Sequence, residues 1–266
     1  MQTLAPATKL TGALSEAAKG RIERADGRPL FLADWMRAVF IHFETDPAAL
    51  QKCVPFELDL RDGRAYVSLV AFTMERMRLS FAGRLGAWML SAFSSQRFLN
   101  VRTYVRAADE TGIYFLAEWL SSRLSVPLGP VIFGLPYHPA RLEYRHAREV
   151  GEISGQVTPA RGAGRLSYRA KMDAGSAPSG CVAGSLEEFL MERYTAFTSW
   201  RGKRRLFHVW HEPWPQTPLR EIEIHDRTLL ASTGEWTRSA GCIGASFSEG
   251  VRGVWMGWPH RMKPHL

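Results

Sequence analysis

An arginine and a glutamate in two neighbouring apolar runs are the residues of this chain best suited to acid–base or anion-binding chemistry. Arg102 lies in the run 99–106, and Glu118 is the single charged residue of the run 114–120. A guanidinium binds carboxylate or enolate-like oxygens through paired hydrogen bonds, and a carboxyl beside it can orient the guanidinium or transfer a proton. The pair therefore indicates a ligand-binding or catalytic site, with Glu118 as the candidate acid or base.

The run 99–106 has the period of two that is typical of a β-strand. One face carries Leu99, Val101, Thr103 and Val105, and the other carries Asn100, Arg102, Tyr104 and Arg106. Residues 108–112 resemble a turn, and a turn centred on Glu110 would place Arg102 directly opposite Glu118 in an antiparallel pair. A structural ion pair is the alternative, because the attraction between two buried charges is offset by the cost of removing them from water.

Other motifs give weaker evidence of chemistry. His208 and His211 are three residues apart, which puts them on opposite faces of a strand and argues against a shared metal ion. His211 stands just before Pro213 and Trp214 and is predicted either to contact a ligand or to pack in a corner. We find no P-loop, no G-x-S-x-G and no dinucleotide-binding motif, so the sequence predicts no cofactor and no metal.

The composition is that of a soluble globular protein. The chain has 266 residues, 45% of them hydrophobic, and a net charge of +8. The basic residues are spread from Arg21 to Arg261 without a recognisable nucleic-acid module, so we expect no nucleic-acid partner. The longest apolar stretch, 81–93, is too short to span a bilayer and is predicted to form a helix. The oligomeric state is not predicted.

We expect a cytoplasmic protein, because no apolar signal segment opens the chain and the cysteines (Cys53, Cys181 and Cys242) are isolated and odd in number. The chain is divided into a loose leader at 1–28, a single β-barrel domain at 29–233 and a Gly- and Trp-rich tail at 234–266 without an assigned role.

Many short strands with a few helices predict an α+β fold that is mainly antiparallel β. Asp62-Gly63 is a hairpin turn signal before a strand at 65–72. Asp46-Pro47 predicts the start of a short helix. Ser185 and Glu188 form a capping box, from which we expect a helix over 185–197.

Several of these pieces, in this order, resemble the YqjF-like family of uncharacterised bacterial proteins. The matching segments span roughly 31–230, and the most specific are the N-V-R-T-Y-V block at 100–105 and the block from Leu186 through Phe189, Leu190 and Glu192-Arg193-Tyr194. The others are Phe43-Glu44-Thr45-Asp46-Pro47, Val54-Pro55, Asp62-Gly63 with 65–72, Gly112-Ile113-Tyr114-Phe115, Leu135-Pro136-Tyr137 and His211-Glu212-Pro213-Trp214.

The YqjF-like family looks related to the acetoacetate decarboxylase superfamily, and this resemblance implies a closed, strongly bent β-barrel with a central cavity and a few peripheral helices. Acetoacetate decarboxylase uses a lysine Schiff base activated by an adjacent cation. This chain departs from that pattern, because no two of its lysines are adjacent; they are Lys9, Lys19, Lys52, Lys171, Lys203 and Lys263.

If the barrel forms, the polar face of the run 99–106 and Glu118 line its cavity. The expected ligand-binding residues are Asn100, Arg102, Tyr104, Tyr114, Glu118, Tyr137 and His211. The first hypothesis is a protein that holds a small acidic or carbonyl-bearing molecule. The alternatives are a lyase-type enzyme that uses Glu118 or a tyrosine as acid or base, and a non-catalytic scaffold whose cavity is filled by side chains. Whether the protein is an enzyme stays open at this point.

Overall fold

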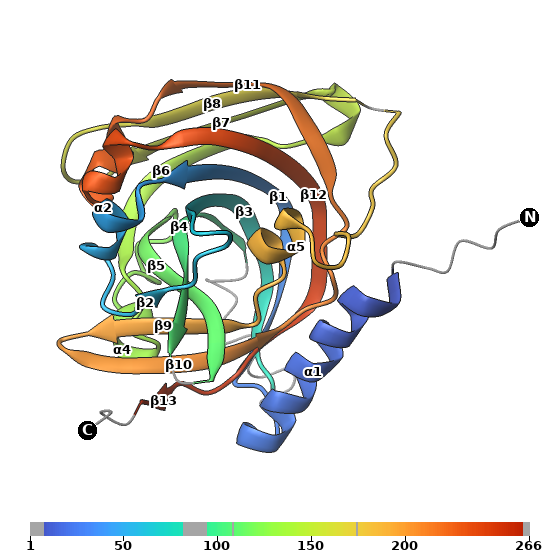
Figure 1. The fold of residues 1–266 in the computed structure, drawn as a ribbon, viewed down its shortest axis with the longest axis vertical. Coiled ribbons are helices and arrows are strands. Elements are labelled where there is room, and N and C mark those ends of the chain that lie inside the picture. The colour runs from blue at the N-terminus through green and yellow to red at the C-terminus, as the bar shows by residue number, and fades with distance from the viewer. Residues whose placement is uncertain (1–7, 82–94, 108, 174, 263–266) are drawn as a thin grey trace, which may run out of the picture.

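The protein is a strongly bent, mostly antiparallel sheet with a few helices at its periphery (Figure 1). The computed structural model describes residues 8–81, 95–107, 109–173 and 175–262. The expected α+β, mainly antiparallel fold is confirmed. The expected helix at 81–93 lies almost entirely outside the described residues.

The elements follow one another in a chain dominated by strands. They are α1 (Thr8–Asp26), β1 (Phe31–Thr45), α2 (Pro47–Gln51), β2 (Glu57–Leu58), β3 (Ala65–Leu79), β4 (Ser95–Ala107), β5 (Glu110–Leu120), α4 (Leu128–Ile132), β6 (Tyr137–Arg145), η2 (Arg148–Val150), β7 (Glu152–Pro159), β8 (Leu166–Met172), α5 (Leu186–Met191), β9 (Thr195–Trp200), β10 (Lys203–Trp210), β11 (Thr217–Asp226), η3 (Thr228–Thr233), η4 (Glu235–Arg238), β12 (Gly241–Met256) and β13 (His260–Arg261).

The strands close into a ring with a second layer on one side. Pairing runs from β4 through β3, β1, β12, β10, β9 and β5 back to β4, and β6, β7, β8 and β11 form a second path from β5 to β12. The β5–β6 and β5–β9 pairs are parallel. One apolar cluster fills the ring, with Phe40, Phe98 and Tyr104 among its members. A second lies between the ring and the outer layer, with Leu99 and Val101 among its members. The two faces of β4 therefore enter different cores, as its alternation predicts.

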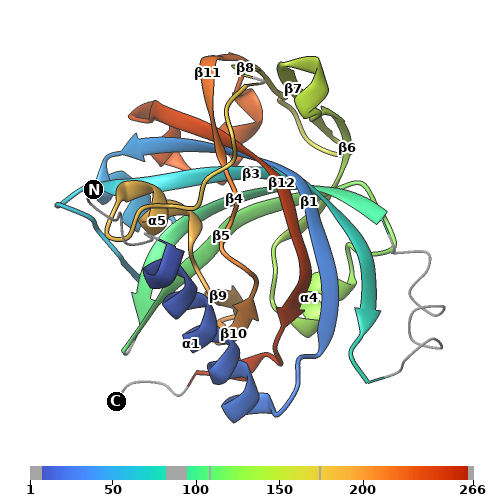
Figure 2. The ribbon, with the colours of Figure 1, turned by 90° about the vertical axis from the view of Figure 1, so that its right-hand side faces the viewer.

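The N-terminal segment that we set apart as a loose leader contains α1, a helix that packs against β10 (Figure 2). Ala18 and Ile22 are fully buried, and the Ser15 hydroxyl donates a hydrogen bond to the carbonyl of His211 at 2.6 Å. These positions recur at three- and four-residue spacing, the period of a helix face. Because two of the three are small, they make a weak apolar stripe, which explains why the sequence pattern did not indicate the packed helix.

The C-terminal segment 234–266, which we set apart as a tail, supplies a central strand of the ring. β12 pairs with β1 along almost its whole length, contacts β11 near its middle at Ser246 and Phe247, and contacts β10 at its C-terminal end. Its glycines hide the strand from a pattern based on β-propensity. At Gly250, φ is +121° and a side chain would collide with the backbone of Trp35, so glycine permits the close approach of the two strands there. The boundary at residue 233 therefore does not separate a tail from the barrel.

The helix expected over 185–197 is shorter than predicted. Ser185 accepts a hydrogen bond from the amide of Glu188, which confirms the cap, but α5 ends at Met191. Residues 195–200 form β9, which pairs with β10. The apolar residues Tyr194 and Phe197 fit a helical stripe in the sequence, yet strand pairing decides their conformation. At α2, Asp46 accepts hydrogen bonds from Ala48 and Ala49, as predicted for its start.

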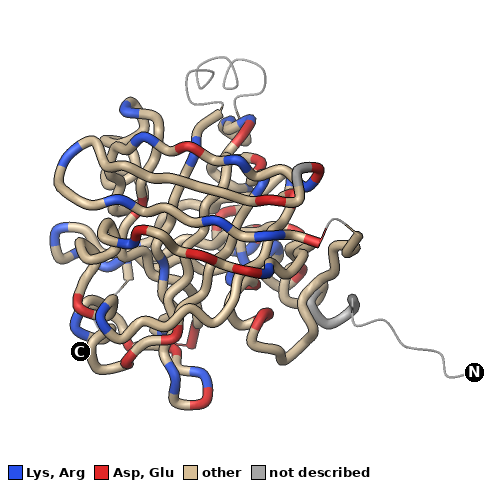
Figure 3. The backbone as a smooth tube through the Cα atoms, turned by 90° about the horizontal axis from the view of Figure 1, so that it is seen from above, with Lys and Arg blue, Asp and Glu red and all other residues tan. Residues whose placement is uncertain are grey.

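Basic and acidic residues are interspersed along the strands of the outer layer, as Figure 3 shows from above. Ion pairs join several of them, including Arg169 with Glu152 and Lys171 with Glu221. In the described part of the chain, no helix combines the length and apolar character that a membrane crossing requires.

Candidate functional site

The pairing of β4 with β5 decides which polar side chains face the inside of the ring. Glu118 lies opposite Asn100, and Arg102 lies opposite Phe115, so the predicted register that set Arg102 against Glu118 is corrected. The turn between the two strands comes before Glu110 and is not centred on it, because Ala107 already pairs with Glu110. Between the Val101–Ala117 and Arg102–Phe115 pairs, Leu116 is an extra residue, which makes a β-bulge.

The bulge at Leu116 turns both Phe115 and Glu118 towards the interior of the ring. They are three residues apart, so a regular strand would point them to opposite faces. Because Leu116 and Ala117 both face outward, Glu118 returns to the same side as Asn100 and Arg102. The structure therefore brings the guanidinium and the carboxyl to one cavity without pairing them directly.

The cavity inside the ring has a volume of about 70 Å³. Five predicted site residues line it: Asn100, Arg102, Glu118, Tyr137 and His211. Aromatic and aliphatic side chains make up most of the remaining wall, among them Trp35, Phe72, Phe98, Phe115, Phe207 and Trp214. An apolar wall with a few converging polar groups is the usual form of a small-molecule site.

Arg102 is buried, with 7% of its surface exposed, and its guanidinium is only partly satisfied. One terminal nitrogen donates to the carbonyl of Leu190 at 3.0 Å, while Nε has no hydrogen-bond partner among the described residues. Burial lowers the pKa of Arg102 from its ordinary value. An arginine nevertheless keeps its proton in proteins, so a positive charge is held inside the ring.

Glu118 is 3% exposed, and its Oε2 likewise has no partner within the described residues. Burial raises its pKa well above the ordinary 4.5, since no nearby cation offsets the cost of removing a carboxylate from water. Burial therefore favours the neutral carboxylic acid form of Glu118, which can donate a hydrogen bond. Asn100, which faces it across the strands, has an unpartnered Oδ1 in the same described region.

Tyr137 and His211 complete the polar part of the wall. Burial raises the pKa of Tyr137, and proximity to Glu118 adds to the rise. The Nδ1 of His211 lies 2.7 Å from the carbonyl of Glu212, which fixes it as the donor and leaves the lone pair on Nε2. Burial and the charge of Arg102 lower the pKa of His211 to about 4, so the ring is neutral at pH 7.

Tyr104 supports the site from behind. Its hydroxyl donates a hydrogen bond to the carbonyl of Leu190 at 2.7 Å and lies 2.5 Å from the hydroxyl of Ser68. The Ser68 hydroxyl is also hydrogen-bonded to Nδ1 of His42 at 2.7 Å. Tyr104 and Arg102 thus share one carbonyl acceptor. Tyr104 does not appear among the residues that line the cavity, so its place is that of a positioning residue for Arg102.

Tyr114 is not part of this arrangement. It lies between Ile113 and Phe115, both of which face the cavity, and strand alternation turns its ring to the opposite side of β5. There it packs against Phe56 with ring centres 5.6 Å apart. In a regular strand Tyr114 would share a face with Glu118, and this is why it was predicted as a site residue. The bulge at Leu116 lies between the two residues and puts them on opposite faces.

Two further polar residues near the cavity were noted in the sequence only as parts of a helix motif. Arg193 lines the cavity, and its guanidinium is 3.0 Å from Asp59 and stacks on the ring of Phe189. Glu192 accepts hydrogen bonds from the Tyr194 hydroxyl at 2.6 Å and the Trp214 amide at 2.9 Å. The block L-x-x-F-L-x-E-R-Y therefore anchors the chain as it leaves α5.

No lysine is among the residues that line the cavity in the part of the chain that the structure describes. Lys171 is paired with Glu221 on the outer layer, and Lys19 of α1 lies over the rings of Trp210 and Trp255. These positions do not supply a desolvated amine beside Arg102.

The comparisons with known proteins agree with the resemblance seen in the sequence. Residues 32–252 match the DUF2071 family, which is described as an uncharacterized conserved protein. The chain belongs to this family. The protein YqjF of Bacillus subtilis (strain 168) is 30% identical over 207 residues, which are 76% of this chain and 82% of YqjF. Membership of the YqjF-like group is therefore confirmed.

The fold is that of acetoacetate decarboxylase-like proteins. Acetoacetate decarboxylase from Legionella pneumophila matches with a TM-score of 0.59 and 13% identity, over 87% of either chain. An acetoacetate decarboxylase-like enzyme from Sphingomonas wittichii RW1 matches with a TM-score of 0.59 and 17% identity, over 88% of this chain and 94% of the other. The enduracididine biosynthesis enzyme MppR, in complex with pyruvate, has a TM-score of 0.59 and 12% identity, over 89% and 91%. The expected bent barrel is confirmed.

Proposed function

We propose that the cavity of this DUF2071 protein binds a small carboxylate or another carbonyl-bearing anion, with Arg102 as its main partner. The observation that carries the proposal is that three buried polar atoms, on residues that line the cavity, have no hydrogen-bond partner among the described residues. They are Asn100 Oδ1, Arg102 Nε and Glu118 Oε2. A buried polar atom without a partner costs about 1–3 kcal/mol, and a bound ligand would remove that cost.

The charges around the cavity favour an anion. Burial raises the pKa of Glu118 and so disfavours a negative charge there. The charge of Arg193 is balanced by Asp59. Glu192 is the carboxyl that favours the charged form of Arg102, but its two oxygens are already hydrogen-bonded to Tyr194 and Trp214. The guanidinium of Arg102 is thus free to receive a carboxylate through Nε and a terminal nitrogen.

The volume limits the size of the ligand. A cavity of about 70 Å³ corresponds to about five water-sized positions at ~10–15 Å³ each. Acids of about four to six non-hydrogen atoms, such as acetate and pyruvate, suit this space. MppR, which has the same fold, was solved with pyruvate bound, and that supports the choice of a short 2-oxo acid.

Calorimetric titration with acetate, pyruvate and the neutral analogue acetamide tests the proposal. We expect saturable binding of the acids and none of acetamide. Arg102→Leu should weaken binding about ten- to hundredfold, because hydrogen bonds to a charged group contribute about 1.5–3 kcal/mol. Arg102→Lys keeps the charge but loses the paired donors, so it should bind with intermediate affinity.

The matched control is Arg220→Gln, which removes an exposed guanidinium on β11 and should leave the affinity unchanged. Circular dichroism and thermal melting show whether each variant is folded. If the folded wild-type protein binds none of the acids, the proposal fails and the cavity belongs to a non-catalytic scaffold. Equal binding by a folded Arg102→Leu protein would exclude Arg102 as the partner.

We further propose a lyase-type reaction as a second candidate, because a neutral carboxyl beside an anion site is suited to general acid catalysis. Glu118 would give its proton to the carbonyl oxygen of a bound 2-oxo acid, and the neutral Nε2 of His211 would accept a proton from the adjacent carbon, which yields the enol. Exchange of the pyruvate methyl protons in D₂O, followed by NMR, measures this step.

Glu118→Gln separates the two candidates, since an amide can still donate a hydrogen bond but cannot transfer a proton. We expect pyruvate binding to persist and exchange to fall about 100-fold or more. Borohydride treatment with pyruvate should trap no adduct, because no lysine was found in the cavity wall among the described residues. Exchange at the wild-type rate in the variant would exclude Glu118 as the acid.

We place the protein in the cytoplasm, where thiols stay reduced. The three cysteines are free in the structure, and Cys242 is exposed.

A further inference from the structure

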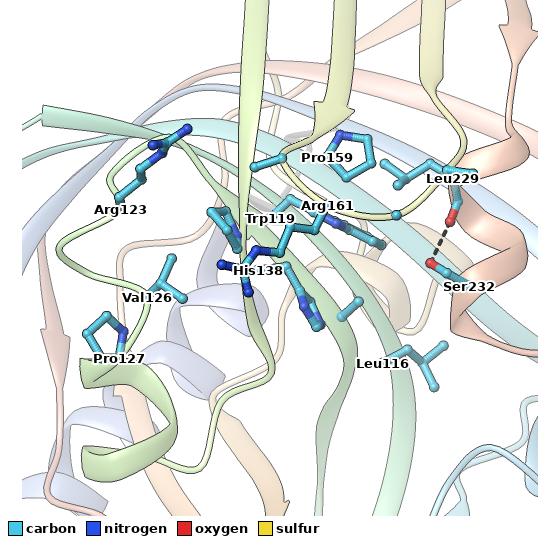
Figure 4. Close-up of a pocket in the computed structure, with 15 residues that line it drawn as sticks. Leu116, Trp119, Arg123, Val126, Pro127, His138, Pro159, Arg161, Leu229 and Ser232 are labelled. Atoms are coloured by element: carbon cyan, nitrogen blue, oxygen red, sulfur yellow. Dashed lines mark hydrogen bonds between the residues drawn. The ribbon is translucent and has the colours of Figure 1, made fainter.

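A groove on the outer face of the ring lies behind the same strand that carries Glu118 (Figure 4). Its volume is about 710 Å³, which is within the range of about 300–1,000 Å³ that is usual for ligand sites. It has no lining residue in common with the central cavity. The two spaces are therefore separate compartments on opposite faces of β5.

The floor of the groove is apolar as a consequence of the β-bulge. Leu116 and Ala117 are consecutive, yet both line the groove, and Trp119 follows on the same face. Val126 and Leu229 extend the apolar surface from the flanking segments. Ala117 and Trp119 are each 4% exposed and Leu116 is half-buried, so the floor is a narrow apolar strip against which a hydrocarbon or aromatic body can pack.

The rim of the groove is positively charged. Arg123 and Arg161 are exposed and lie among its lining residues, which contain no aspartate or glutamate within the described structure. Figure 4 shows the Arg161 side chain extended across the groove in this view. His138 packs on Trp119 with ring centres 5.8 Å apart.

Neither Arg123 nor Arg161 forms an ion pair or a side-chain hydrogen bond with any residue that the structure describes. Arginines of the adjacent strands differ, since Arg141 pairs with Glu143 and Arg169 with Glu152. The groove thus combines an apolar floor with two cations whose charge is not balanced locally, which is complementary to a ligand with an apolar body and an anionic end.

We propose that this groove is a binding site for an amphipathic carboxylate, separate from the small-anion site inside the ring. The apolar body lies on Leu116, Ala117 and Trp119, and the carboxylate is held by Arg161 with Arg123. The proposal does not depend on the function of the central cavity, since no residue is shared and the ligand is far larger than a space of about 70 Å³.

The fluorescent acid 1-pyrenebutyrate is a suitable probe, and 1-pyrenebutanol is its neutral counterpart. Fluorescence anisotropy of the full-length protein should show saturable binding of the acid that weakens with added salt, at least tenfold tighter than that of the alcohol. The double variant Arg123→Gln/Arg161→Gln should lose at least tenfold in affinity. Because both side chains are exposed, the variant is expected to fold normally.

The control Arg220→Gln removes one exposed positive charge elsewhere and should bind as the wild type does. Saturating pyruvate should not displace the probe; displacement would place the probe in the central cavity and overturn the proposal. Equal affinity for acid and alcohol, or unchanged binding by the double variant, would also overturn it. So would a dimer in sedimentation that excludes the probe, because a second copy would then be what covers the groove.

Discussion

Arg102 and Glu118 respond differently to the same burial. Removing either group from water disfavours its charged form. A guanidinium begins from such a high pKa that it stays charged, whereas a carboxyl near 4.5 becomes neutral as its pKa rises. The result is a cationic cavity with a carboxylic acid as a hydrogen-bond donor. Had the predicted direct pairing formed, the arginine would have held Glu118 ionised and the two charges would have cancelled.

The ionisation of Glu118 gives a pH-dependent stability that can be measured. The unfolded chain releases this proton near pH 4.5, whereas the folded protein retains it to a higher pH. Stability is therefore lost as pH rises from about 4.5 towards the folded pKa. Glu118→Gln lacks the group, so its stability relative to the wild type should grow by about 1.4 kcal/mol per pH unit across that window.

Urea unfolding of both proteins between pH 4 and pH 8 provides the measurement. At pH 4 the carboxyl is mostly neutral in both states, so the difference between the two proteins should be smallest. The exposed Glu249→Gln serves as a control and should change stability by less than about 0.5 kcal/mol. A difference between Glu118→Gln and the wild type that is independent of pH would contradict the assignment.

At the scale of elements, one extra residue in β5 determines both compartments. The bulge at Leu116 sends Glu118 inward and leaves Leu116 and Ala117 together on the outer face. The α1 helix plays a different part, since it holds the backbone of His211 from outside through Ser15. It belongs to the packed structure, because Ala18 and Ile22 are fully buried.

Two truncations on one helix test whether α1 is packed. Ile22→Ala removes a fully buried side chain and should lower the free energy of unfolding by about 2–5 kcal/mol. Leu14→Ala, at a position that is 44% exposed, should change it by less than about 0.5 kcal/mol. Urea unfolding gives both values. Equal and negligible effects would mean that the segment is the loose leader first expected from the sequence.

Local patterns predicted those elements whose signal is carried by neighbouring residues. They include the two faces of β4, the helix caps at Asp46 and Ser185, and the polar residues around Arg102. The bulge at Leu116 was not predicted, because no glycine or proline marks it and it depends on pairing with β4. For the same reason α5 was predicted too long, since the pairing of β9 with β10 overrides a helical stripe that ends in Tyr194 and Phe197.

At the scale of the whole molecule, the closed ring keeps a charge out of water, and the second layer provides a separate outer surface. Segments from both ends of the chain complete the arrangement, as β12 closes the ring beside β1 and α1 packs on β10. Neither could be placed from local sequence, because their contacts join residues about 200 positions apart, as between Ser15 and His211, where the separation is 196.

A crystal structure of the full-length protein grown with pyruvate tests the central claim most directly. We predict pyruvate inside the ring, with its carboxylate on Nε and a terminal nitrogen of Arg102 and an oxygen within hydrogen-bond distance of Glu118. A ring interior closed around Arg102, or one that holds only water at a pyruvate concentration that saturates the calorimetric titration, would contradict the account.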